Sequence, residues 1–221
     1  MANIAVICEG VSEFNILNHI VSRYAGEHFL NAIQPRINYN KQTQSDDGGW
    51  SRVLDHCTNE VIEDIFKLND YLIIQIDTDS SHISPFDIVH NFKDGTEKSH
   101  ERLHAEIKAR LVRDLSNEIR KRYLHRIFFA ICHNEIECWL LPIYYTDKRA
   151  CKTHNCIKVL NLELSRRNMA GIPDTNKNSS QARKAYNAIF KSMKKRAIIE
   201  QMATNSYGFK CFLLGLDSMS S

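Results

Sequence analysis

Acidic residues follow three apolar runs of the sequence that have the composition of buried strands. The runs are residues 4–8, 71–76 and 127–132, and the acids after them are Glu9, Asp77, Asp79, Glu135 and Glu137. In a parallel sheet the carboxyl ends of the strands lie at one edge, and ligands bind beyond that edge. Neighbouring parallel strands would therefore bring these carboxylates together. The place where they meet is the candidate site for chemistry.

Several carboxylates at one place favour a divalent cation. Without a counter-charge they repel one another and raise one another's pKa. Hard cations such as Mg²⁺ or Mn²⁺ prefer oxygen ligands and keep positions open for water. The spacing of Asp77 and Asp79 puts both side chains on the same side of an extended chain, as shared ligation requires. A metal held there would neutralise charge, orient a phosphate and make a bound water more acidic.

Each acid also has an ordinary structural interpretation. A turn or a helix cap explains Asp77 and Asp79, and a turn explains Glu9, since Gly10 follows it. The first turn of a helix, where negative charge is favourable, explains the remaining acids, which are Glu13, Glu135 and Glu137. The combination of acids at three strand ends is stronger than any single member.

Histidine and cysteine give weaker signals. His82 and His133 lie near the acids in the sequence and are accessory candidates for contacting a phosphate or a metal. A single histidine is more often a hydrogen-bonded structural residue. Cys151, His154 and Cys156 have a spacing that could belong to a zinc site, although a fourth ligand is not evident. The seven cysteines, an odd number, favour reduced thiols in a cytoplasmic protein over a disulfide framework.

The elements that must position the acids alternate between strand and helix. We expect strands at 4–8, 36–40, 71–76 and 127–132. Helices are expected from Ser12 to about Tyr24, over 50–66 and as one long helix over 103–119, with a polar loop over 77–99. This order predicts an α/β fold, with a mostly parallel central sheet flanked by helices. We predict one α/β metal-binding domain over 1–145 and a basic helical region over 146–221 that packs on it.

Positive charge is concentrated in the last third of the chain. Residues 147–210 hold 14 Lys and Arg against 4 Asp and Glu, although the whole chain has a net charge of only +3. Such a region favours a polyanionic partner, and solvated helix faces are the alternative. The predicted nucleic-acid contacts are Arg166, Arg167, Arg183, Lys184, Lys191, Lys194, Lys195 and Arg196. Contacts to phosphates of this kind read no base sequence.

Composition and motifs narrow the class of protein. Apolar residues make up 43% and charged residues 25%, as in a soluble globular protein. No apolar run approaches the roughly 20 residues that span a bilayer, and the first residues read as a strand rather than a signal peptide. We expect a cytoplasmic protein with no membrane contact. The phosphate-loop motif is absent from the sequence, so any ATP would be bound by a separate ATPase partner.

Two of the acidic segments resemble the motifs of Toprim domains. Residues 7–13, Ile-Cys-Glu-Gly-Val-Ser-Glu, are similar to the opening motif, and residues 74–79, Ile-Gln-Ile-Asp-Thr-Asp, to the Asp-x-Asp motif. Residues 133–141 and 207–214 resemble further segments of small stand-alone Toprim-like proteins of the OLD-like and RloB-like kind. The resemblance covers about residues 1–142 and is loose beyond them.

This resemblance implies roles for individual residues. Glu9, Asp77 and Asp79 would be the catalytic metal ligands, and Glu13 and Glu137 would support a second metal or orient water. Toprim proteins usually have a glycine soon after the Asp-x-Asp, whereas Ser80 and the two residues after it stand here. That departure leaves open a single-metal or altered site.

The resulting hypothesis is a metal-dependent nuclease that cuts DNA or RNA. The resemblance further implies an effector of anti-phage defence, held in check by or assembled with an ATPase, and a homodimer is open to a nuclease of this size. Two alternatives remain. A non-catalytic adaptor would bind nucleic acid or a partner without cutting, and a phosphatase or nucleotide-sugar transferase would use Asp77 and Asp79 but give Glu9 no role.

Overall fold

A parallel sheet of four strands forms the centre of the computed structural model, which describes residues 1–38, 43–44, 47–173 and 176–220. The strands are β1 (Asn3–Ile7), β2 (Phe29–Gln34), β5 (Tyr71–Asp77) and β6 (Ile127–Cys132), in the spatial order β2-β1-β5-β6. All three pairings are parallel. The predicted α/β class with a parallel central sheet is therefore confirmed.

The register of the strands places the acids at one edge. Ile7 at the end of β1 is paired with Ile74 in β5, and Asp77 at the end of β5 is paired with Cys132 at the end of β6. Residues after β1, β5 and β6 consequently leave the sheet side by side. β5 and β6 are buried on both faces, as their unbroken apolar sequences predict.

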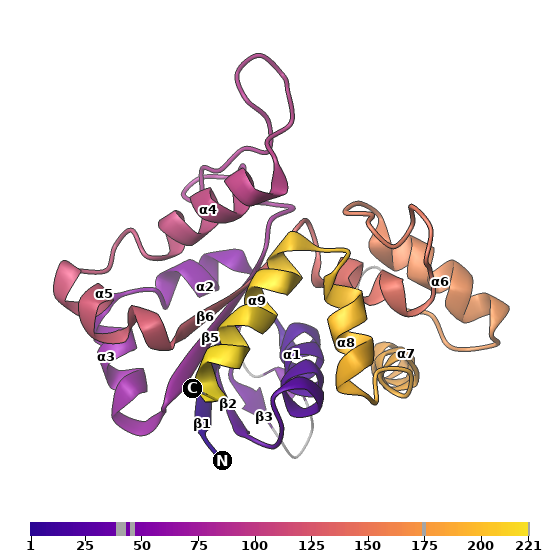
Figure 1. The fold of residues 1–221 in the computed structure, drawn as a ribbon, viewed down its shortest axis with the longest axis horizontal. Coiled ribbons are helices and arrows are strands. Elements are labelled where there is room, and N and C mark those ends of the chain that lie inside the picture. Colours follow the sequence, from indigo (N-terminus) through magenta and orange to yellow (C-terminus); the bar gives the residue numbers. More distant parts are fainter. Residues whose placement is uncertain (39–42, 45–46, 174–175, 221) are drawn as a thin grey trace.

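Helices cover both faces of the sheet (Figure 1). One face carries α2 (Trp50–Asp55), α3 (Asn59–Leu68), α4 (His100–Leu111), α5 (Asn117–Tyr123) and the short η1 (Leu124–Arg126). The other face carries α1 (Val11–Tyr24) and α9 (Tyr207–Asp217), followed by η3 (Ser218–Ser220). The helices beyond them are η2 (Ile136–Ile143), α6 (Cys156–Arg166), α7 (Ser180–Phe190) and α8 (Arg196–Ala203). Alternate strand residues contribute to two separate apolar clusters, one on each face.

The C-terminal helices share the core of the sheet. Helix α9 lies against β6 (Figure 1), and Phe209 of α9 stacks on Trp139 of η2 with ring centroids 4.4 Å apart. Both side chains are almost completely buried. The cluster that contains Ile4 and Val6 of β1 thus continues into the last helix of the chain. The division at residue 145 stays a prediction.

The second strand of the sheet is not where it was predicted. The sheet uses β2, whereas the predicted strand over 36–40 supplies only β3 (Ile37–Asn38), which pairs antiparallel with β4 (Thr43–Gln44). Residues 39–40 lie outside the described part of the chain. β2 is an edge strand with a mixed exposure pattern and a weakly apolar sequence. Pro35, which has no N–H to donate, follows it directly.

Three predicted helices have different bounds in the structure, and the one expected over 50–66 is two helices, α2 and α3. The single helix over 103–119 is two helices, because Ser116 caps α5 by accepting a hydrogen bond from the backbone N–H of Ile119 at 3.2 Å. The first helix begins at Val11, one residue before its predicted start at Ser12. No helix in the described ranges has the length and apolar character that a bilayer crossing needs.

Gly208 provides a test of the packing of α9 on the sheet. A Cβ atom at this position would lie 2.0 Å from the backbone carbonyl oxygen of Ile131, so the helix would have to shift. We expect Gly208→Ala to lower the free energy of unfolding by about 1–3 kcal/mol despite its better helix propensity. Urea unfolding followed by circular dichroism measures the change. Lys210→Ala, an exposed change in the same helix, should stay within about 0.5 kcal/mol of the unchanged protein. Equal stability of the two variants would contradict this packing.

Candidate active site

Glu9 and Asp77 are joined at the ends of the two central strands. The backbone N–H of Asp77 donates to Oε1 of Glu9 at 2.7 Å. Gln75 of β5 bonds to both residues. Its Oε1 accepts from the backbone N–H of Glu9 at 3.1 Å, and its Nε2 donates to Oδ1 of Asp77 at 2.8 Å. Gln75 is completely buried. The orientation of both carboxylates is therefore set by the sheet itself.

A second group of carboxylates surrounds Lys177. Nζ of Lys177 lies 3.0 Å from Oε2 of Glu137, and 4.0 Å from both Oε1 of Glu13 and Oε2 of Glu135. Glu137 is fully buried, and its Oε1 accepts a hydrogen bond of 2.6 Å from the hydroxyl of Tyr186. Every carboxylate of this group thus has its charge opposed by a single ammonium.

Lys177, Tyr186 and Gln75 were missed by the sequence analysis. Lys177 and Tyr186 follow Glu137 by 40 and 49 residues, and nothing in their local sequence distinguishes them from other residues of a basic region. Gln75 did carry a signal, because it is the one polar residue between Tyr71 and Asp77 in a strand that is otherwise apolar.

Glu135 has a structural role as well as its place near Lys177. Its Oε1 accepts from the backbone N–H groups of Cys156 at 2.8 Å and Ile157 at 3.3 Å, at the start of α6. These are donors that a helix leaves without an internal partner. A negative charge there is also favourable to the helix dipole.

The prediction that all cysteines are reduced thiols was wrong for two of them. Cys138 of η2 and Cys156 of α6 form a disulfide, with their Cα atoms 5.0 Å apart. The other five cysteines are free. The residues around His154 whose spacing could belong to a zinc site do not assemble either, because Cys156 is oxidised and the thiol of Cys151 donates to Asn205. A separation of 18 residues carries no sign of this pairing, which depends on how η2 meets α6.

Asp79 differs from the other acids in its surroundings. It is exposed and lines a cavity of about 530 Å³, and the other residues around that cavity are His82, Val89, His90, Asn91, Asn134 and His154. His82 thus shares a cavity with Asp79. His133 does not line this cavity, and the centroid of its ring lies 4.0 Å from that of His100 and 5.9 Å from that of His90. Burial, together with the neighbouring histidines, lowers the pKa of His133 to about 3, so this ring is neutral at neutral pH.

Burial and mutual repulsion raise the pKa values of the carboxylates. Burial raises the pKa of Glu9 to about 8, and the charges of Glu13 and Asp79 add to the effect. Burial and the charge of Glu9 raise the pKa of Asp77 well above its usual range. Burial disfavours the charged form of Lys177, but the surrounding carboxylates outweigh it and raise the pKa of its ammonium. The site therefore favours any added positive charge.

The donor atoms are of the type that a hard divalent cation prefers, but they are not close enough together to bind one ion. Glu9 and Asp77 offer only oxygen, as Mg²⁺ and Mn²⁺ prefer. In the described residues, however, Glu9, Asp77 and Asp79 do not form a group with donor atoms all within 4.8 Å of one another. The group that does is Glu135, Cys138 and Cys156, and its two sulfurs are already bonded together. Binding of one ion by all three predicted ligands would require at least one of these side chains to move.

Three of the predicted nucleic-acid contacts form ion pairs with neighbouring acids. Arg166 and Arg167 both form ion pairs with Glu163, at 3.5 and 2.8 Å, and Arg196 pairs with Glu200 and Asp217. Arg183 lines a cavity between α1 and α7. The remaining four are exposed lysines, which are Lys184, Lys191, Lys194 and Lys195. Three of the eight predicted positive charges are thus opposed by neighbouring carboxylates.

Comparison with models of protein families, with curated proteins and with solved structures finds no match for this chain. The resemblance to Toprim domains stays a prediction. What the protein does is inferred below from the geometry of its own residues.

The stability of the metal-free protein should fall as the pH rises. The folded-state pKa values of Glu9 and Asp77 lie above those of unfolded carboxyls, so the folded state binds more protons between about pH 4.5 and pH 8. Over that window each rise in pH favours unfolding. Thermal unfolding in EDTA from pH 5 to pH 8.5 should show a falling Tm, and Glu9→Gln should flatten the fall. A Tm that rises over the same window would show that these groups are not held as described.

Removal of Lys177 should destabilise the protein and make its stability depend on metal. Lys177→Met leaves the buried carboxylates without their ammonium, which should cost about 3 kcal/mol in the absence of divalent ions. Mn²⁺ should restore part of the loss because it supplies the missing positive charge. Lys184→Met is the matched control, since Lys184 is an exposed lysine of α7. If both variants unfold alike in urea with EDTA, Lys177 does not hold the cluster.

Proposed function

We propose that the protein is a divalent-metal-dependent nuclease that hydrolyses phosphodiester bonds of DNA or RNA. The observation that carries the proposal is the gathering of four acids at one sheet edge, where Glu9 and Asp77 are joined and Glu13 and Glu137 lie beside the ammonium of Lys177. Buried carboxylates in this number are costly unless a cation or a proton is shared among them. A phosphate that approaches this edge also needs positive charge between itself and the acids.

Glu9, Asp77 and Asp79 would hold Mg²⁺ or Mn²⁺ in this proposal. The bound ion would offset the charge of the phosphate and make a water molecule acidic enough to attack phosphorus near neutral pH. Oε1 of Glu9 and Oδ1 of Asp77 accept hydrogen bonds within the sheet, so the second oxygen of each carboxylate is the one offered outward. Gln75 holds both groups in place.

Lys177 would act on the phosphate as a fixed positive charge. Its ammonium is anchored at 3.0 Å from Glu137, and Tyr186 fixes the other oxygen of that carboxylate. Held in this way, the ammonium has lost little freedom when a phosphate oxygen arrives, which favours binding. It also provides positive charge where a second metal ion would otherwise be needed, in line with the altered Toprim motif after Asp79.

A non-catalytic adaptor is the second candidate function. Two observations favour it: Lys177 already opposes the charge of Glu13 and Glu137, and Asp79 lines a cavity that the other acids do not line. An adaptor would keep the fold and the surface lysines without needing a bound metal.

The biological setting is proposed from the sequence resemblance alone. It comprises a cytoplasmic effector of anti-phage defence, a separate ATPase partner and a homodimer as one open oligomeric state. None of these is required by the chemistry of the site.

The proposal is tested by incubating the purified protein with plasmid DNA, single-stranded DNA, tRNA and total RNA in Mg²⁺, Mn²⁺ or EDTA. We expect metal-dependent cleavage, reduced at least about 100-fold in Glu9→Gln and Asp77→Asn, because each removes a charge from the metal site and is otherwise isosteric. Cleavage is measured on gels and by release of acid-soluble nucleotides.

Asp64→Asn is the control for these variants. Asp64 is an exposed acid of α3 that pairs with Lys67, so its substitution should leave cleavage unchanged. Retained cleavage in both Glu9→Gln and Asp77→Asn would point to a contaminant or another site. Absence of both cleavage and Mn²⁺ binding would favour the adaptor.

A further inference from the structure

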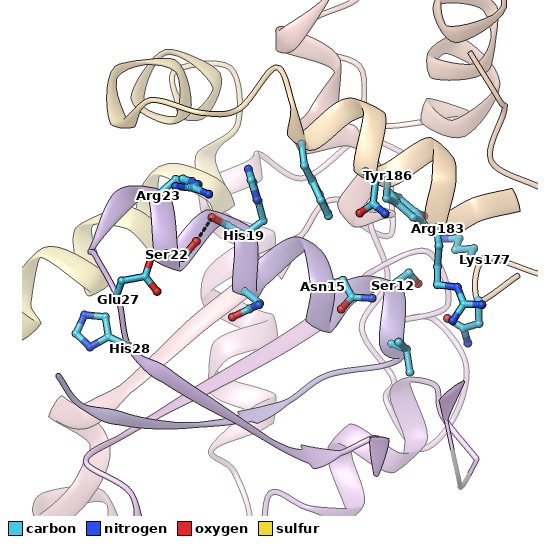
Figure 2. A pocket seen from close by; sticks show the side chains of 15 residues that line it. Ser12, Asn15, His19, Ser22, Arg23, Glu27, His28, Lys177, Arg183 and Tyr186 are labelled. Atoms are coloured by element: carbon cyan, nitrogen blue, oxygen red, sulfur yellow. Dashed lines mark hydrogen bonds between the residues drawn. The ribbon is translucent and has the colours of Figure 1, made fainter. Parts of the chain in front are cut away.

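A polar cavity of about 450 Å³ lies between α1 and α7 (Figure 2). Its volume falls within the range of small-molecule sites, about 300–1,000 Å³. The side chains that face it come from two elements far apart in the sequence, and Figure 2 shows Asn15 and His19 on α1 opposite Arg183 and Tyr186 on α7. The cavity is therefore formed only when the C-terminal helices dock against the first helix.

The cavity and the carboxylate site share a wall. Lys177, Ser12 and Tyr186 line the cavity, and each of them also contacts an acid. Lys177 and Tyr186 bind Glu137, and the hydroxyl of Ser12 donates to Glu13 at 2.9 Å. A molecule in the cavity would consequently lie next to the acidic sheet edge.

Three amide side chains face the cavity with no partner of their own. In the described part of the chain, Asn15, Asn18 and Asn187 have no hydrogen bond or other recorded interaction of the side chain. Asn15 and Asn18 lie one turn apart on α1, and Asn187 comes from α7. An amide offers two donors and an acceptor, which is the combination that pairs with the edge of a nucleobase.

A pair of stacked rings adds a flat surface to the same cavity. His19 of α1 and Phe190 of α7 lie with centroids 4.5 Å apart and planes 8° from parallel. Nε2 of His19 is within 3.1 Å of the carbonyl oxygen of Met193, which fixes the ring. Bases stack on aromatic side chains with little regard to sequence. An amide wall beside aromatic rings suits a base, which has both a hydrogen-bonding edge and a flat face.

Positive charge lies at the end of the cavity near the acids. Lys177 and Arg183 both line the cavity, and Lys177 is the residue that also contacts the acids (Figure 2). Arginine and lysine are the residues that most often contact nucleic-acid phosphates. A nucleotide placed with its base among the asparagines would direct its phosphate towards these two cations and hence towards Glu9 and Asp77.

From these observations we infer that the cavity between α1 and α7 binds one nucleoside phosphate unit. The unit is a nucleotide of a single strand, held beside the bond that the carboxylate site would cleave. This inference rests on the proposed nuclease function for its purpose, but the binding itself needs neither metal nor cleavage. A base within a duplex is paired and stacked and could not enter, so the substrate class is single-stranded nucleic acid.

The test measures binding in EDTA, where no metal-dependent cleavage occurs. The four nucleoside monophosphates, a single-stranded trinucleotide and ribose 5-phosphate are titrated into the intact protein by calorimetry. We expect the trinucleotide and at least one mononucleotide to bind at least about tenfold more tightly than ribose 5-phosphate, because only they carry a base. Asn187→Ala and Asn15→Ala should each weaken nucleotide binding about fivefold to tenfold and leave binding of ribose 5-phosphate unchanged.

Asn117→Ala, an exposed asparagine of α5 on the opposite face of the sheet, is the matched control and should bind like the unchanged protein. Phe190→Leu keeps an apolar side chain but removes the ring, and should also weaken nucleotide binding.

The inference is overturned if ribose 5-phosphate binds as well as nucleotides, or if both cavity asparagine variants bind normally. If mononucleotides bind and the trinucleotide does not, the inference that the ligand belongs to a single strand is overturned, and the ligand is a free nucleotide. If binding depends on the base but the protein cleaves none of the substrates, the nuclease proposal is wrong and the inferred nucleotide site is retained.

Discussion

The structure depends on how buried carboxylates at one sheet edge are kept from repelling one another. Parallel strands bring Glu9 and Asp77 together, and the following segments add Glu13 and Glu137. Desolvation of a charge costs several kcal/mol, and removal of the partner of a buried charge costs more than the pair contributes. Lys177 is therefore a requirement of the metal-free fold as well as a candidate contact for phosphate. Its 3.0 Å contact with Glu137 ties the last third of the chain to the sheet edge.

This tie explains why the C-terminal region is more than a basic surface. Apolar side chains pack α9 against β6 and α7 against α1, so the apolar cluster on that face runs from the first strand to the last helix. The same docking delivers Lys177 and Tyr186 to the acids and closes the polar cavity beside them. The same docked helices therefore complete both the apolar core and the site. A change that loosens α7 or α9 should disturb both.

The site also shows a conflict between stability and chemistry. A cluster of raised carboxyl pKa values destabilises the folded state as pH increases, while the same cluster attracts the cations that phosphoryl chemistry uses. Around it the chain supplies rigid support. Gln75 orients two of the acids from within the sheet, and the disulfide between Cys138 and Cys156 joins the segment of Glu137 to the helix capped by Glu135.

The sequence by itself determined the α/β class and the position of the acids at strand ends, because apolar runs and the residues after them are local signals. It placed β1, β5 and β6 well, and it failed at β2, whose edge position leaves no clear apolar pattern. Only the tertiary structure decided that Lys177 and Tyr186 meet Glu137, that Cys138 meets Cys156, and that Asp79 turns towards the histidines. These are contacts between elements distant in sequence, and they arise from the docking of helices on the sheet. The spacing of residues along the sequence does not show how the helices dock on the sheet.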